Sequence, residues 1–138
     1  MTFLKVSAYY LDFVRFAARK ASDLNSLSYD QRMKYLFSFS FGWADFWKRH
    51  IEEDKNIPVT EIIYNVDIVQ KKWAEEHGIR FTENDWQNEI LEAQIGFYKP
   101  EVIFFEDYVK VPIDYKRKFP FIKFIVCWDG LAHQNPAR

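Results

Sequence analysis

Two carboxylates directly follow a short apolar run, and of all side chains in the sequence they are the best placed for chemistry. Glu106 and Asp107 end the stretch Glu101–Asp107, which reads EVIFFED and follows Lys99-Pro100. A short run of β-branched and aromatic residues predicts a strand that is buried on both faces, as in the middle of a parallel sheet. Open α/β sheets bind ligands beyond the carboxyl ends of their strands, close to the point where strand order reverses. We therefore expect Glu106 and Asp107 at a functional site.

Three further strands and several helices are needed to position these carboxylates. Strands are predicted over residues 3–9, 59–65 and 121–128, which are apolar and β-branched or aromatic. Residues 19–27 are expected to form a loop. The first helix is expected over residues 28–51, beginning at Ser28 and Gln31, which have the spacing of a capping box. Shorter helices are expected over residues 67–77, 82–97 and 112–119.

The alternation of strands and helices predicts the fold class. Connections of crossover length between strands indicate a parallel sheet with helices on both faces. The third strand is the most apolar and belongs in the centre beside the first. We therefore predict one α/β domain over residues 1–138, a Rossmann-like three-layer sandwich of about four strands in the order 2-1-3-4. Such a sheet has an open edge at its last strand.

In this topology the ends of all four strands meet at one edge of the sheet. Hydroxyls, an amide, carboxylates and aromatic rings would gather there, and such a set suits a polyol such as a sugar. The alternative is that these residues only mark where strands exit into water. The predicted substrate-binding residues are Ser7, Tyr9, Tyr10, Asn65, Glu106, Trp128, Asp129 and Gly130, with Trp43 lining the cleft and Asp107 as the catalytic candidate.

The chemistry of the acidic pair has more than one interpretation. Asp107 could act as a general base towards an acceptor hydroxyl if aromatic surroundings raised its pKa. It could equally cap the segment that follows. Glu106 and Asp107 could instead hold Mg²⁺ together with Asp12, as paired carboxylates do in phosphoryl-transfer sites.

Other kinds of site lack their sequence patterns. The three histidines lie far apart, so no His or Cys spacing predicts a metal site. No glycine-rich turn follows the first strand, which argues against a dinucleotide cofactor, and no Gly-x-Ser-x-Gly motif occurs. We predict no cofactor and no metal for this chain.

Composition narrows the class of protein and its location. The net charge is −1 and no long basic stripe occurs, which argues against a nucleic-acid partner. No apolar stretch approaches the roughly 18 residues that a membrane-spanning helix needs. The single cysteine, Cys127, excludes an internal disulfide and favours a reducing compartment. We therefore expect a cytoplasmic protein.

Five segments, in the same order along the chain, resemble the N-terminal half of bacterial glycosyltransferases of the GT-B type. The resemblance is to members from surface-polysaccharide biosynthesis and to spore-maturation glycosyltransferase-like proteins. Its most specific piece is Phe41–Trp47, which reads FGWADFW. The other segments are Leu4–Tyr10, Leu27–Gln31, Gln70–Ala74 and Val102–Asp107.

The resemblance implies two Rossmann-like domains that face each other across a cleft. The N-terminal domain would contact a saccharide acceptor, and the C-terminal domain would hold the nucleotide-sugar donor for metal-independent transfer. The second domain is missing from this sequence, so we expect the acceptor-side half of the enzyme, inactive without a donor-binding domain or partner chain. Two alternatives are a flavodoxin-like or receiver-like binding module with an acidic pocket, and a structural subunit that docks on another chain.

Overall fold

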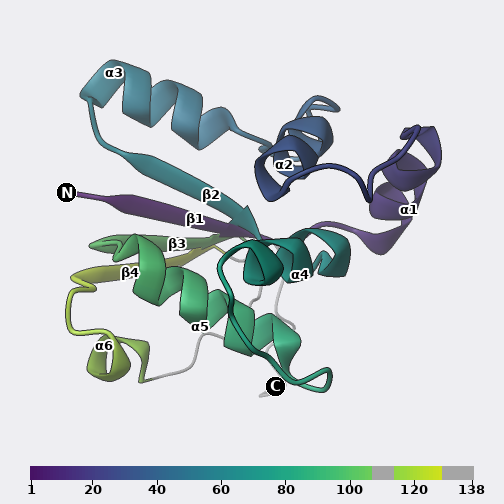
Figure 1. Ribbon diagram of the computed structural model, residues 1–138. Coiled ribbons are helices and arrows are strands. Elements are labelled where there is room, and N and C mark those ends of the chain that lie inside the picture. Colours follow the sequence, from purple (N-terminus) through teal and green to yellow (C-terminus); the bar gives the residue numbers. More distant parts are fainter. Residues whose placement is uncertain (107–113, 129–138) are drawn as a thin grey trace, which may run out of the picture.

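The centre of the fold is a parallel sheet of four strands. The computed structural model describes residues 1–106 and 114–128. The strands are β1 (Phe3–Ser7), β2 (Val59–Ile63), β3 (Val102–Glu106) and β4 (Phe124–Trp128). They lie in the order β2-β1-β3-β4, and every neighbouring pair is parallel (Figure 1). The predicted α/β class and strand order are confirmed.

One face of the sheet is covered by α5 (Trp86–Tyr98) and α6 (Tyr115–Lys118). Alternation along the parallel strands places apolar side chains on this face. They form one core cluster with the helices, made of Leu4, Val6, Ile62, Leu91, Ile95, Ile103, Phe105, Tyr115 and Ile122. The predicted helix over residues 112–119 is α6, while Pro112 lies outside the described residues.

A second core lies at the carboxyl ends of the strands. There α1 (Leu11–Lys20), α2 (Tyr29–Phe37) and α4 (Asp67–Glu76) gather beyond the arrowheads of β1 and β2 (Figure 1). Trp73 of α4 is fully buried in this cluster. No helix was predicted before residue 28, and α1 corrects this. Its apolar residues are a weak guide to the helix because only Ala17 in it is fully buried, while Leu11 and Phe16 are exposed.

The predicted helix over residues 28–51 is wrong in its second half. Its start is confirmed, because Gln31 N–H donates to Ser28 Oγ at 3.3 Å and Ser28 N–H donates to Gln31 Oε1 at 2.9 Å. However, α2 ends at Phe37, and Ser40, Gly42 and Ala44 have positive φ angles of 51°, 58° and 36°. Three left-handed residues within five positions cannot continue an α-helix.

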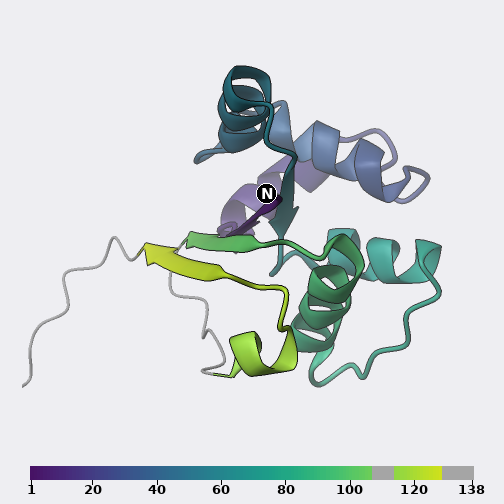
Figure 2. The same ribbon diagram turned by 90° about the vertical axis from the view of Figure 1, so that its left-hand side faces the viewer.

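The chain becomes helical again on the other face of the sheet. A π-helical turn, η1 (Lys48–Glu52), continues into α3 (Glu53–Lys55), and both lie above β2 and β1 (Figures 1 and 2). Phe39 and Phe41 of the segment before them pack on α1, where the Phe41 ring stacks on Phe13 at 4.0 Å between centroids. The periodic apolar pattern through residues 38–47 therefore serves tertiary packing, which overrides helix propensity here.

Candidate functional site

The carboxyl ends of β1 and β3 are joined by two of the predicted site residues. Ser7 Oγ donates a hydrogen bond to Glu106 Oε2 at 2.8 Å. Both side chains come from the last residues of their strands, and they lie on the face that η1 covers. The structure therefore brings a hydroxyl and a carboxylate together at the switch point between β1 and β3, as predicted. Asp107, Asp129 and Gly130 lie outside the described residues.

A completely buried lysine extends this pair along the sheet. Lys5 Nζ lies 3.2 Å from Glu106 Oε2 and 3.8 Å from Glu61 Oε2, and its side chain is 0% exposed. It also donates a hydrogen bond to the carbonyl oxygen of Ala44 at 3.2 Å. A buried ammonium is tolerated only when it is paired and hydrogen-bonded, and Lys5 meets both conditions.

Glu61 is the most perturbed carboxyl group of this network. Its Oε1 accepts the Lys48 backbone N–H at 2.7 Å. Burial raises the pKa of Glu61 to about 7, although Lys5 and the Lys48 N–H act in the opposite direction. A carboxyl group that titrates near neutral pH can hold or release a proton under physiological conditions, which a general acid or base requires.

Tyr9 and Asn65 form a clamp between the segments that follow β1 and β2. Tyr9 N–H donates to Asn65 Oδ1 at 2.8 Å, and Asn65 Nδ2 donates to the Tyr9 carbonyl oxygen at 2.9 Å. The Tyr9 side chain is only 5% exposed. Burial, followed by the charges of Glu106 and Glu61, raises the pKa of its hydroxyl. The structure thus places the Tyr9 ring in the core and uses Asn65 to fix the two strand ends.

Three aromatic side chains of the predicted site remain accessible. Tyr10, Trp43 and Trp128 are 74%, 42% and 47% exposed. Trp43 meets Trp128 edge to face, with 5.9 Å between ring centroids. Trp128 is the register partner of Glu106. The two tryptophan rings therefore lie at the same carboxyl edge of the sheet as Ser7 and Glu106. An exposed aromatic pair beside a hydroxyl–carboxylate pair is the arrangement that the sequence analysis expected for a polyol.

Lys5 and Glu61 were not among the site residues predicted from the sequence. Each is the central residue of a strand that is otherwise mostly apolar, and they are register partners. A charged residue inside a strand of a parallel sheet is buried and needs a partner of opposite charge. Reading the two central charges together would have predicted the pair.

The alternative of a magnesium site receives no support from the described residues. Asp12 lies on α1, where its carboxylate pairs with Arg15 at 3.2 Å. Within residues 1–106 and 114–128, no group of three His, Cys, Asp or Glu side chains is arranged to hold a metal ion. Over the same ranges, no helix has both the length and the apolar character needed to cross a bilayer.

Comparisons with known proteins assign no family to this arrangement. No family model, curated protein or solved structure matches the chain. The function must therefore be argued from the fold and the side chains of the site.

Proposed function

We propose that this chain is the acceptor-binding domain of a glycosyltransferase and that a saccharide binds at the carboxyl edge of its sheet. The observation that carries the proposal is the grouping of Ser7, Glu106 and the Trp43–Trp128 pair at that edge. The resemblance of the five sequence segments to GT-B glycosyltransferases supports the same function.

The side chains at this edge suit the two kinds of surface that a sugar presents. Carboxylate and hydroxyl groups exchange hydrogen bonds with sugar hydroxyls, while an aromatic ring packs against the apolar face of the sugar ring. Glu106 is paired with Lys5 at 3.2 Å, so the buried ammonium holds its carboxylate in place at this edge. In this proposal Glu106 accepts hydrogen bonds from hydroxyl groups of the acceptor.

We assign the role of general base to Asp107, which directly follows Glu106 in the sequence. In this role Asp107 takes the proton of the acceptor hydroxyl. A neighbouring carboxylate can act as a general base when its surroundings raise its pKa. The nucleotide-sugar donor is assigned to a second domain or a partner chain. On this proposal the chain alone binds an acceptor but transfers no sugar, because it does not stabilise the leaving diphosphate.

The proposal is tested by titrating the 138-residue chain with maltose, lactose and chitobiose and following tryptophan fluorescence. We expect saturable binding of at least one disaccharide in the millimolar range, weakened about tenfold or more by Trp43→Ala and by Glu106→Gln. Phe16→Ala is the matched control, because Phe16 is a similarly exposed aromatic residue, at 48%, on α1.

Two results would overturn the proposal. One is the absence of saturable binding to all three disaccharides. The other is sugar transfer from a nucleotide-sugar by the purified chain, because the acceptor-side domain alone should not catalyse it. Stabilisation against heat by millimolar Mg²⁺ would instead favour the receiver-like alternative.

A further inference from the structure

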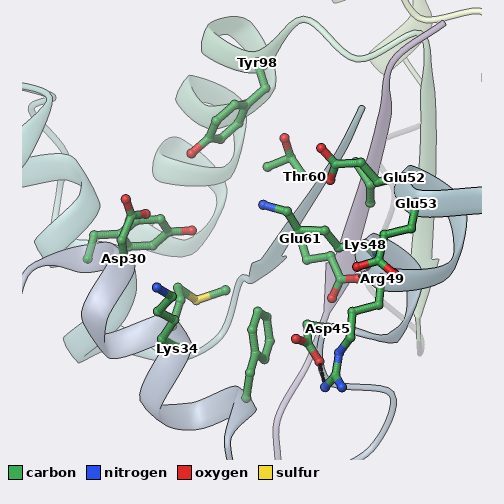
Figure 3. A pocket seen from close by; sticks show the side chains of 14 residues that line it. Asp30, Lys34, Asp45, Lys48, Arg49, Glu52, Glu53, Thr60, Glu61 and Tyr98 are labelled. Carbon is green, nitrogen blue, oxygen red and sulfur yellow. Dashed lines mark hydrogen bonds and ion pairs between the residues drawn. The ribbon is translucent and has the colours of Figure 1, made fainter. Parts of the chain in front are cut away.

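A cleft of about 800 Å³ opens beside β2, the edge strand at the other side of the sheet from β4. One wall is α2, which contributes Asp30 and Lys34, and the opposite wall is η1 with α3 (Figure 3). Thr60 and Glu61 of β2 lie between the walls. The volume is within the range of about 300–1,000 Å³ that is typical of small-molecule sites.

Two buried carboxylate oxygens on the lining of this cleft lack a hydrogen-bond donor. They are Oε2 of Glu52 and Oε2 of Glu61, and neither accepts a hydrogen bond from the described residues; Glu61 Oε2 faces the Lys5 ammonium at 3.8 Å, which is beyond hydrogen-bond reach. The Glu61 side chain is only 3% exposed, so bulk water does not surround it. Most buried polar atoms in proteins have a hydrogen-bond partner, and those that have none require an explanation. A ligand with hydroxyl groups would supply the two missing donors.

Donors and apolar surface complete the lining. The ammonium groups of Lys34 and Lys48 form no ion pair with any described residue. Arg49, by contrast, is already paired with Asp45. The apolar part of the lining comes from Met33, Phe37, Val59 and the ring of Tyr98. Acceptors, donors and apolar surface in one cleft match a neutral molecule that carries several hydroxyls around an apolar ring face.

We propose that this cleft is a second saccharide site, which binds one neutral sugar ring through hydroxyl groups that donate to Glu61 and Glu52. Lys48 donates to a further hydroxyl of the same ring. Its lining comes mainly from β2, α2, η1 and α3, with Tyr98 from α5, and it includes neither Trp43 nor Trp128 of the aromatic edge.

The Lys48 amide is a built-in reporter of this site, because it donates to Glu61 Oε1 at 2.7 Å. We would titrate the isotope-labelled 138-residue chain with methyl α-glucopyranoside and record amide chemical shifts. The expected result is a saturable shift of the Lys48, Thr60 and Glu52 amides. Glu52→Ala should weaken this binding about tenfold, while Asp54→Ala, an exposed change on α3 outside the cleft lining, should not alter it.

Each outcome decides the proposal. Glu61→Gln keeps the size of the side chain and also tests the acceptor, because the amide can present its nitrogen where the carboxylate oxygen lay. Unchanged binding by both Glu52→Ala and Glu61→Gln would overturn the proposal. So would shifts at the Trp43 and Tyr10 amides alone, although these would support the acceptor site at the strand ends. Shifts of the cleft amides with inorganic phosphate but not with the glucoside would show an anion site and would also overturn the proposal.

Discussion

Lys5 Nζ lies 3.2 Å from Glu106 Oε2, and this ion pair connects the middle of β1 with the carboxyl end of β3. The lysine is fully buried, and the side chain of Glu106 is 13% exposed. Because the same ammonium also faces Glu61 at 3.8 Å, one cation compensates two carboxyl groups. The pair therefore holds the candidate site to the centre of the sheet.

Removal of the cation should destabilise the fold strongly. We expect Lys5→Met to lower the free energy of unfolding by about 3–5 kcal/mol, because the change leaves Glu106 buried without a counter-charge. Urea denaturation followed by circular dichroism measures the loss.

A compensating change separates the charge effect from the packing effect. Adding Glu106→Gln to Lys5→Met removes the uncompensated charge while Ser7 can still donate to the amide oxygen at this position. We expect the double variant to regain a large part of the lost stability. A double variant as unstable as the sum of both single variants would show that charge pairing is not what Lys5 contributes.

Glu61 should make the stability of the fold depend on pH. Its pKa is raised from 4.5 to about 7 in the folded protein, mainly by burial. Below pH 4.5 both folded and unfolded chains carry the proton, and the contribution to stability is complete. Between pH 4.5 and 7 only the folded chain keeps the proton, so stability falls as the pH rises, by about 3 kcal/mol in total. Above pH 7 the contribution is flat.

The measurement for Glu61 is the free energy of unfolding between pH 4.5 and 8, compared with that of Glu61→Gln. Other groups that titrate in this range act on both proteins and cancel in the difference. The free energy of unfolding of Glu61→Gln, minus that of the parent protein, should rise by about 3 kcal/mol between pH 4.5 and 8. Parallel curves for the two proteins would mean that Glu61 has the same pKa in the folded and unfolded chains, which would contradict the prediction.

The clamp between Asn65 and Tyr9 should hold the strand ends together. We expect Asn65→Ala to cost about 2 kcal/mol, since it removes two hydrogen bonds to the Tyr9 backbone. The Tyr9 amide should also exchange with solvent faster, because its acceptor is lost. Asn88→Ala is the control, since the Asn88 side chain donates to the exposed Asp85 and its loss should cost less than about 0.5 kcal/mol. Unchanged exchange at Tyr9 would contradict the role of the clamp.

The sheet could be predicted from the sequence because each strand is a short apolar run of its own. The run over residues 101–107 contains four consecutive apolar residues, and β3 lies inside the sheet beside β1. The helices that connect the strands were less predictable. The apolar spacing of Phe37, Phe41 and Ala44 imitates a helix, but the chain leaves the helical conformation so that Phe41 can stack on Phe13. Such a contact between distant residues has no local signature.

The residues of the candidate site that lie at strand ends were predicted from the sequence. Those that lie in mid-strand were not, because their role depends on which residues of neighbouring strands are paired. Ser7 and Glu106 were found because parallel strands end at one edge. Lys5 and Glu61 lie in mid-strand, and their importance follows from the register that makes them neighbours. The cleft beside β2 escaped prediction because it depends on where the chain between α2 and η1 turns.

The contact between Trp43 and Trp128 gives a last prediction, which links the β4 edge to the segment before η1. The rings meet edge to face at 5.9 Å, and such pairs contribute about 0.5–1.5 kcal/mol beyond the area they bury. A double-mutant cycle with Trp43→Leu and Trp128→Leu should therefore give a coupling energy in that range.

The reference cycle combines Trp43→Leu with Phe16→Leu, for which we expect a coupling close to zero, because Phe16 packs on Phe39 of another surface. Equal coupling in the two cycles would mean that β4 and the Trp43 segment are held together by other contacts. A coupling in that range would show that the two rings stabilise each other without a ligand, which would lower the ordering cost of binding a sugar at this edge.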